Sequence, residues 1–334
     1  MIAPALFTNR VDAATLEAIA VDIAEIEREL SRQVGSRIEL VDDVCSHTLQ
    51  AGGKRLRPAF VALAAKACGT PYDATRVVRL GACMEMIHMA TLIHDDVIDR
   101  ADTRRGKATA SAVFGNTAAI LSGDVLLARA MTILAQDGDL EIIRLVSSAV
   151  VELAEGEVRE LETRGRIELT EAEHFEILRM KTASFIECCC RVGAKVASAP
   201  VEIEDALGCY GHTIGMAFQV VDDLLDYRGD HAKTGKPVAT DYVEGCPTLP
   251  LIYLWPLLEA NERDQVASAF GHQSAVDTVP IVVRWMNERG AFTRAEATAD
   301  RMGSEAVSAL SSLPTSSERD LLEAVADFVI NRQA

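Results

Sequence analysis

Two aspartate clusters inside apolar helical runs constrain this chain more than any other feature. Residues 95–99 read DDVID and residues 222–226 read DDLLD. On an α-helix, positions i and i+4 share a face, so the first and last carboxylates of each cluster project together. Mg²⁺ takes oxygen ligands and in proteins often joins one or two carboxylates to substrate phosphates. The clusters therefore predict a metal–phosphate ligand. The candidate metal ligands are Asp95, Asp96, Asp99, Asp222, Asp223 and Asp226.

Acidic residues on a helix usually form a solvated face. That interpretation suits a single pair such as Asp42-Asp43, where Ser46 stands in place of a third carboxylate. The clusters at 95–99 and 222–226 differ, because each follows an apolar stretch in the sequence. That order places the carboxylates at the mouth of a core, which favours metal binding over plain solvation.

The apolar pattern predicts an all-α fold. Apolar residues recur at helical spacing nearly throughout, β-branched alternation is scarce, and Gly or Pro separates the segments. No low-complexity linker divides the chain, so we expect one domain, 1–334, in which the glycine- and proline-rich stretch 229–250 forms a functional loop or lid. Helices are expected over residues 13–33, 36–50, 58–68, 74–101, 116–136, 139–163, 171–198 and 203–228, with several shorter ones from 249 to the end.

Composition excludes several classes of partner and location. A formal net charge of −17 disfavours a nucleic-acid partner, whose phosphates would be repelled, and an anionic substrate would need metal ions or local cations. The eight cysteines include no Cys-x-x-Cys pair and are expected to be reduced and mostly small core residues. No uncharged apolar run approaches a membrane span, and the first residues lack the pattern of an export signal. We therefore expect no transmembrane segment and a cytoplasmic location.

Basic residues near the clusters are candidates for phosphate binding. Residues 104–106 (RRG) begin five residues past Asp99, and arginines there can grip diphosphate oxygens bidentately. Residues 52–58 (GGKRLRP) carry three cations into a helix, whose N-terminus itself favours anions. A solvated basic turn is the alternative for any one cation, but their crowding beside two glycines favours binding. Lys233 and Lys236 either close over a bound anion or are ordinary exposed loop residues.

Further polar residues lie within apolar helices. His88 stands two helical turns before Asp95 on nearly the same face, and a core role and a phosphate contact are equally good interpretations. Lys181-Thr182 and Gln219 also lie in apolar runs. A buried lysine is costly unless it is paired, and a nearby phosphate would pair it.

Together these motifs closely resemble those of the trans-polyprenyl diphosphate synthases. The resemblance covers most of the chain and includes its ending, residues 327–332. It implies an all-α isoprenoid synthase fold, in which both aspartate helices face each other across a deep central cavity. The motifs that carry it are residues 52–58, Glu85-x-x-His88, 95–99 with 104–106, Gly123-Asp124, Lys181-Thr182-Ala183, Phe218-Gln219 with 222–226, and Thr248-Leu249-Pro250.

The resemblance implies a Mg²⁺-dependent prenyltransferase, expected as a homodimer, that repeatedly condenses isopentenyl diphosphate onto an allylic diphosphate. Metal ions would stabilise the departing diphosphate, and the isopentenyl double bond would attack the resulting allylic cation. The implied catalytic residues are Asp95, Asp96, Asp99, Asp222, Arg104, Lys181, Thr182 and Gln219. The implied substrate-binding residues are Lys54, Arg57, His88 and Arg105 for isopentenyl diphosphate, and Arg104, Lys181, Gln219 and Lys236 for the allylic diphosphate.

Two positions depart from the pattern of this family. Glu160 stands where the family often has Gln, and Cys246 stands where it usually has Lys. Cys246 removes one cation from the loop that precedes residues 248–250. Neither change touches an aspartate of the two clusters.

The helix leading to Asp95 is implied to form the cavity wall that sets product length. Ala90 is small where shorter-chain synthases tend to carry an aromatic residue, so the growing tail should pass it. The helix rises about 13 Å from Met86 to Asp95, which predicts a long product, octaprenyl to decaprenyl. The alternative is that these residues are ordinary core packing and that the product is geranylgeranyl or farnesyl diphosphate. The candidate chain-length residues are Met86, Ile87, Ala90, Thr91 and, on the neighbouring helix, Met131.

Two alternatives come from different classes of protein. A terpene cyclase shares aspartate-bound Mg²⁺ but would not need residues 52–58. A non-catalytic subunit of a heteromeric synthase should have lost carboxylates from one cluster, whereas all six aspartates are present here.

Overall fold

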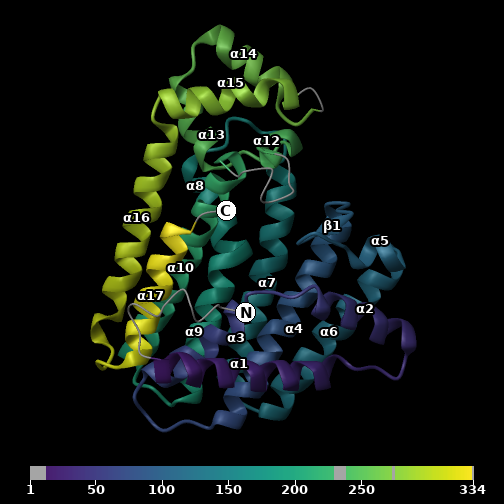
Figure 1. Ribbon diagram of the computed structural model, residues 1–334, viewed down its shortest axis with the longest axis vertical. Coiled ribbons are helices and arrows are strands. Elements are labelled where there is room, and N and C mark those ends of the chain that lie inside the picture. Colours follow the sequence, from purple (N-terminus) through teal and green to yellow (C-terminus); the bar gives the residue numbers. More distant parts are fainter. Residues whose placement is uncertain (1–12, 229–237, 273–274, 333–334) are drawn as a thin grey trace. The chain divides into compact units, whose positions relative to one another are not determined.

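The computed structural model describes residues 13–228, 238–272 and 275–332 and confirms the predicted all-α class (Figure 1). Its strands, within the described residues, are β1 (Thr103–Arg104) and β2 (Lys107–Ala108), which pair antiparallel. The α-helices are α1 (Ala13–Val34), α2 (Glu39–Gln50), α3 (Leu56–Ala67), α4 (Ala74–Ile98), α5 (Ala110–Phe114), α6 (Asn116–Asp137), α7 (Leu140–Thr163), α8 (Glu171–Leu178), α9 (Ser184–Val196), α10 (Val201–Arg228), α12 (Thr240–Glu244), α13 (Leu249–Leu254), α14 (Ala260–Ala269), α15 (Ala275–Glu288), α16 (Ala291–Ala309) and α17 (Ser317–Asn331). Shorter turns are η2 (Arg179–Ala183), η3 (Trp255–Leu257) and η4 (Leu310–Ser312).

The chain divides into two compact units. Unit 1 comprises Met1–Ser147, Cys188–Gly208 and Ser312–Ala324, and unit 2 comprises Ser148–Glu187, Cys209–Ser311 and Val325–Ala334. The first aspartate cluster belongs to unit 1 and the second to unit 2. The single domain over 1–334, and the two clusters facing one another across a cavity, stay predictions.

In unit 1, α4 packs against α6, α3 and α1. Close approach depends on glycine at two points of this core. A Cβ on Gly81 of α4 would lie 3.0 Å from Cδ1 of Ile26, and a Cβ on Gly123 of α6 would lie 2.4 Å from Nε2 of His94. The resulting contact between α4 and α6 fixes the helix that carries the first aspartate cluster.

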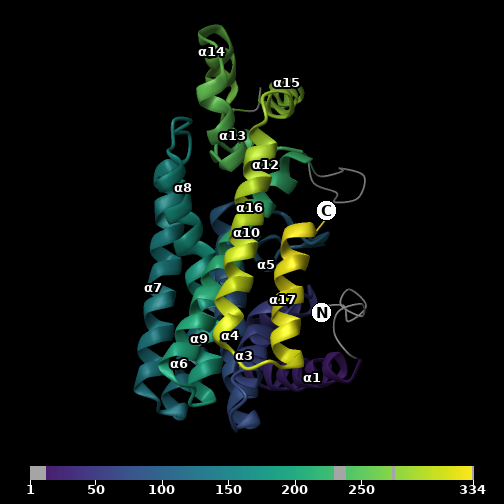
Figure 2. The ribbon, with the colours of Figure 1, turned by 90° about the vertical axis from the view of Figure 1, so that its left-hand side faces the viewer.

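In unit 2, α13 packs against α16 and α8. The C-terminal part of α17 lies against α16, where a Cβ on Gly303 would come 1.8 Å from Cδ1 of Ile330 (Figures 1 and 2). Tyr253 of α13 ties these helices together, because its hydroxyl donates to Glu171 of α8 at 2.7 Å and contacts Thr298 of α16 at 3.1 Å.

The predicted helix over 171–198 was wrong in one respect. The structure has α8, then the π-helical turn η2, then α9. Two glycines pack against this turn: a Cβ on Gly156 would lie 2.7 Å from Cβ of Met180, and one on Gly215 would lie 2.7 Å from Cα of Ala183. The wider turn therefore bulges into space that only glycine leaves open. The helix predicted over 74–101 also ends early, at Ile98, with Asp99 as its C-cap.

One described helix, α6, is long and apolar enough to cross a membrane by length and composition, with a mean hydropathy of 1.6 over its best window. The core helix of a globular protein passes the same test, and α6 packs on α4. A single such helix is weak evidence for a span. The cytoplasmic location stays a prediction.

Candidate active site

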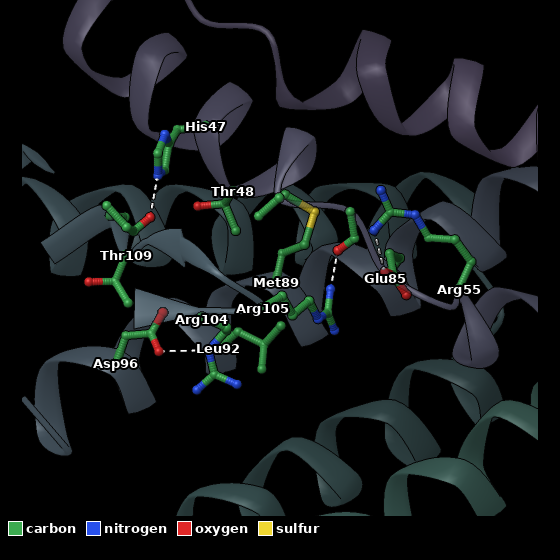
Figure 3. A pocket seen from close by; sticks show the side chains of 14 residues that line it. His47, Thr48, Arg55, Glu85, Met89, Leu92, Asp96, Arg104, Arg105 and Thr109 are labelled. Atoms are coloured by element: carbon green, nitrogen blue, oxygen red, sulfur yellow. Dashed lines mark hydrogen bonds and ion pairs between the residues drawn. The ribbon is translucent and has the colours of Figure 1, made fainter. Parts of the chain in front are cut away.

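The first aspartate cluster ends α4 with its carboxylates on two different sides. Asp96 is buried and accepts a hydrogen bond at 2.6 Å from Nε of Arg104, whereas Asp95 is partly exposed and Asp99 is exposed. The backbone N–H of Asp99 still donates to the carbonyl of Asp95 at 2.8 Å, so the last turn stays helical and the two share a face. Asp95 and Asp99 therefore form the more accessible pair. Asp96 instead anchors Arg104, as Figure 3 shows.

Arg104 and Arg105 lie in a short hairpin built from β1 and β2. Arg104 pairs with Lys107 across the hairpin, and the two turn residues between them, Arg105 and Gly106, have φ values of 53° and 74°. Positive φ at both positions is the signature of a type I′ turn, which fits the twist of paired strands. The hairpin carries the two predicted phosphate-binding arginines on adjacent positions.

The three cations of segment 52–58 differ in how deeply they are buried. Arg55 has a φ of 50° and is buried, where it donates to Glu85 at 2.9 Å and to the Leu49 carbonyl at 3.2 Å. It therefore ties the segment to α4 and is committed to the protein interior. Lys54 is exposed and Arg57 is half-buried at the start of α3, so these two are less enclosed than Arg55.

Two of the predicted isopentenyl diphosphate residues, Arg57 and Arg105, lie near enough to His88 to affect its charge. Burial and then the charges of Arg57, Arg105 and Arg104 lower the pKa of His88 well below its ordinary value. Its imidazole is therefore neutral near pH 7 and can act as a hydrogen-bond donor without adding charge. The Arg105 guanidinium reaches the carbonyl of Gly52, which brings the hairpin to the predicted phosphate-binding segment (Figure 3).

The second aspartate cluster, on α10, is held by several partners, of which sequence reasoning missed His174, Thr240 and Asp241. Asp223 is buried and accepts from Nε2 of His174 at 2.7 Å and from the backbone N–H of Leu249 at 3.1 Å. The Leu249 contact gives residues 248–250 a physical role, since their backbone holds a carboxylate of the cluster. His174 lies 49 residues away in the sequence, so no local pattern could have paired it with Asp223.

The other two carboxylates of this cluster also have partners. Asp222 keeps 44% of its side-chain surface exposed and pairs with Arg332, whose side chain is only 7% exposed and stacks 3.9 Å above the Phe218 ring. Asp226 accepts from the backbone N–H groups of Thr240 and Asp241, both at 3.1 Å. The similarity of residues 327–332 to a family ending was the one signal that pointed to this contact.

Lys181 lies in the η2 turn between two carboxylates of α7. It forms ion pairs with Glu157, at 2.8 Å, and with Glu160. Burial opposes its protonation, but the charges of Glu160 and Glu157 outweigh burial and raise the pKa of Lys181 above its ordinary value. Thr182 is buried and Gln219 is half-buried. Glu160, which departs from the family pattern, thus adds an anion beside a predicted phosphate ligand.

The chain-length candidates lie on α4 and α6, within unit 1. Met86, Ile87 and Ala90 are fully buried, and the hydroxyl of Thr91 donates to the His88 carbonyl at 2.9 Å. Met131 is half-buried on α6, which packs on α4. The structure therefore places four of these candidates on α4 and Met131 on the helix that packs against it. Lys236 lies outside the described residues.

The donor chemistry of the two clusters suits a hard divalent cation. Within the described ranges, no three histidine, cysteine, aspartate or glutamate side chains are already arranged around one point to hold a metal. In unit 1, Asp95 and Asp99 offer carboxylate oxygens one turn apart, and in unit 2 Asp222 is half-exposed. Carboxylate oxygens are donors that Mg²⁺ prefers, together with phosphate oxygens and water.

Comparisons with known proteins agree with this geometry. A sequence model of the family described as Polyprenyl synthetase matches residues 38–286. The chain is similar to heptaprenyl diphosphate synthase component 2 of Geobacillus stearothermophilus, with 36% identity over 93% of this chain and 96% of that protein. It is also similar to octaprenyl diphosphate synthase of Escherichia coli, with 35% identity over 95% of this chain and 97% of that protein.

A solved structure shows the same fold. Polyprenyl synthase from Caulobacter crescentus, in complex with calcium and isoprenyl diphosphate, has a TM-score of 0.89 and 32% identity, covering 96% of this chain and 97% of that chain. Fold and site thus define an all-α prenyltransferase with the isoprenoid synthase fold. The chain belongs to the polyprenyl synthetase family.

Proposed function

We propose that the protein is a Mg²⁺-dependent trans-polyprenyl diphosphate synthase that repeatedly condenses isopentenyl diphosphate onto an allylic diphosphate. One observation carries the proposal: within unit 1, an accessible aspartate pair ends α4 beside a cluster of arginines around a neutral histidine. A carboxylate face suits a metal-bound diphosphate, and an arginine cluster suits a second, metal-free one. A reaction that joins two diphosphate substrates needs both kinds of site.

In unit 1 Asp95 and Asp99, and in unit 2 Asp222, would hold metal ions, and all three carboxylates keep exposed surface. The bound metals would supply electrostatic stabilisation of the charge that develops on the leaving diphosphate. Asp96 and Asp223 would act behind them, because each is buried against a cationic or hydrogen-bond-donating partner.

The remaining residues of the chain would position and neutralise the substrates. Arg104 and Lys181 would balance the negative charge of the allylic diphosphate, and Arg57, Arg105 and His88 would hold isopentenyl diphosphate. Because His88 is neutral, it would donate a hydrogen bond without a proton equilibrium near pH 7. Excluding water protects the allylic cation from quenching.

We propose an octaprenyl to decaprenyl product. Ala90 is small and fully buried on α4, five residues before Asp95. Helix α6 packs on α4. The relatives named as heptaprenyl and octaprenyl diphosphate synthases support a long product. Geranylgeranyl or farnesyl diphosphate stays the alternative, in which side chains elsewhere stop the tail.

The first test is to incubate the purified chain with farnesyl diphosphate, excess isopentenyl diphosphate and Mg²⁺ and to determine product masses. Long polyprenyl diphosphates that disappear with EDTA are the expected result. A geranylgeranyl product would keep the reaction and overturn the product length. No elongation in any metal would overturn the proposal for the chain alone.

A second candidate is that this chain is the catalytic part of a two-component synthase, because the 36% identical relative is named component 2. Both aspartate clusters are complete here, which distinguishes this candidate from a non-catalytic subunit. Elongation that appears only after a second protein is added would select it.

We further propose a homodimer that uses the outer face of α6. Ile120 and Leu121 of this helix are 40% and 57% exposed, and Val113 of α5 is 51% exposed. Exposed aliphatic side chains favour association when a partner covers them. The oligomeric state of an Ile120→Glu/Leu121→Glu variant, measured by light scattering, tests this: the variant should be monomeric.

A further inference from the structure

The arginine hairpin, residues 102–109, is held to the C-terminal end of α2 by three contacts. Nε2 of His47 donates to the carbonyl of Ala108 at 2.7 Å (Figure 3). Nζ of Lys107 donates to the carbonyl of Gln50 at 2.6 Å, and the Arg105 guanidinium donates to the carbonyl of Gly52. Two of these three donors, His47 and Lys107, have no assigned role in the reaction.

The end of a helix is a suitable partner for these cations. The last carbonyls of a helix have no intrahelical partner and carry the negative end of the helix dipole. Gln50 is the last residue of α2, and Gly52 follows its C-cap, Ala51. The contact of Lys107 therefore satisfies a carbonyl that the helix leaves open and uses the favourable electrostatics of the helix end. Arg105 binds the carbonyl of Gly52 just beyond that end.

The hairpin needs such support because its turn is strained. Arg105 has a φ of 53°, a region that L-residues other than Asn and Asp rarely adopt. Strained positions persist where the surroundings determine them from several sides. Lys107 and Ala108 directly follow the turn, so their two contacts to α2 fix the strand that leaves it, and Arg104 on the other strand is fixed by Asp96.

Gly53 leaves space for the Arg105 guanidinium because it has no side chain. A Cβ at this position would lie 2.9 Å from Nη1 of Arg105 and 3.3 Å from Nη1 of Arg55. The missing side chain thus lets the Arg105 guanidinium lie over the backbone of the predicted phosphate-binding segment. A guanidinium has five N–H donors, so its contact with Gly52 leaves others for a ligand.

We propose that His47 and Lys107 are positioning residues, which hold the hairpin on α2 so that Arg105 faces the diphosphate of isopentenyl diphosphate. The inference rests on the proposed function. His47 and Lys107 act through Arg105 and touch no reacting atom, so their loss should weaken binding of one substrate and leave the chemical step intact.

The experiment uses full-length Lys107→Met and His47→Phe variants in steady-state elongation assays with farnesyl diphosphate, isopentenyl diphosphate and Mg²⁺. Methionine keeps the length of the lysine side chain without its donor. Phenylalanine keeps the edge contact of His47 with Phe114, whose ring centroids lie 5.6 Å apart, without the hydrogen bond. Each variant should raise KM for isopentenyl diphosphate about fivefold, with kcat and KM for farnesyl diphosphate within about twofold, which corresponds to roughly 1 kcal/mol.

Conservative variants separate positioning from general damage. Lys107→Arg and His47→Gln retain donors that can reach the same carbonyls, and each should restore KM to within about twofold of the original protein. Arg284→Met removes a cation from an exposed part of α15, where its ion pair with Glu288 spans 3.9 Å, and should change nothing.

The outcomes distinguish this inference from the function on which it rests. Original protein that does not consume isopentenyl diphosphate overturns the proposed function itself. An active original protein with unchanged KM in both variants overturns the positioning role. So does an equal loss for both substrates that the conservative variants fail to rescue, because that pattern indicates damage to the fold.

Discussion

Nε2 of His174 lies 2.7 Å from Oδ2 of Asp223, and both side chains are buried. The same carboxylate oxygen accepts the N–H of Leu249 at 3.1 Å, so one aspartate joins α8, α10 and α13. The three aspartates of each cluster look equivalent in the sequence but differ in the fold. Asp96 and Asp223 are buried against Arg104 and His174. Asp95, Asp99 and Asp222 keep exposed surface.

Loss of the His174 donor should destabilise the protein. In His174→Phe the buried carboxylate of Asp223 keeps only the Leu249 N–H, and leaving a buried charge short of partners costs about 3 kcal/mol. Urea unfolding should show this loss as a lower midpoint with an unchanged slope. His174→Gln, which keeps a donor, should lose less, and His272→Phe at an exposed position is the control. Equal stability of His174→Phe and the original protein would contradict the assignment.

Stability should fall below about pH 6.5 because of His88. Burial and the surrounding arginines lower the pKa of the folded-state imidazole well below its ordinary value, so the unfolded chain binds the proton first as the pH falls. Stability is therefore complete above the unfolded pKa and is lost on acidification toward the folded pKa, by up to about 1.4 kcal/mol per pH unit. His88→Gln should remove this part of the slope. Parallel stability–pH curves for the two proteins would show that His88 is not held neutral.

Glu160→Gln should tighten binding of the allylic diphosphate. Lys181 is shared by Glu157 and Glu160, and a diphosphate must compete with both carboxylates for it. Removing one charge should lower KM for farnesyl diphosphate about threefold, an electrostatic gain of roughly 0.7 kcal/mol. Glu162→Gln is the matched control, because Glu162 lies on the same helix, is 61% exposed and pairs with Arg159 at 3.3 Å. A raised KM would mean that Glu160 orients Lys181 and does not compete for it.

Ala90→Phe should shorten the product. Ala90 is fully buried on α4, five residues before Asp95, which is about 7.5 Å along the helix. A phenyl ring there should block the path of the prenyl tail, and overpacking should cost about 1–3 kcal/mol of stability. Product mass analysis checks the first effect and thermal unfolding the second. Ala90→Ser serves as the size control, and a folded Ala90→Phe protein with the original product length would remove Ala90 from the cavity wall.

Helix positions could be predicted from sequence because burial repeats with the helical period. The helix predicted over 58–68 appears as α3, and that over 116–136 appears as α6. The η2 turn could not be predicted in this way, since it depends on Gly156 and Gly215, which approach it from other helices. A local sequence pattern indicates the period of a helix. It does not indicate which residues of other helices pack against one turn and widen it.

In the candidate site, too, local motifs could be predicted from sequence, whereas contacts between residues far apart in the chain could not. The clusters at 95–99 and 222–226 and the arginines at 104 and 105 are local motifs, and their roles as ligands stay predictions. The partner of Asp222 could not be found from spacing, because Arg332 lies 110 residues further along the chain. The sequence likewise does not distinguish Arg55 from Lys54 and Arg57, because the buried contact of Arg55 with Glu85 appears only in the fold.

The π-helical turn at Arg179–Ala183 has a further consequence for how this segment responds to change in length. A π turn holds one residue more than an α turn over the same path, and each residue rotates a helix by about 100°. Deleting Met180 would let the turn close to ordinary α geometry without moving α9 along its axis. Lys181 would then follow Arg179 directly, and its side chain would point to another face of the helix. We therefore expect the deletion to preserve the helices and to change the direction of the Lys181 side chain.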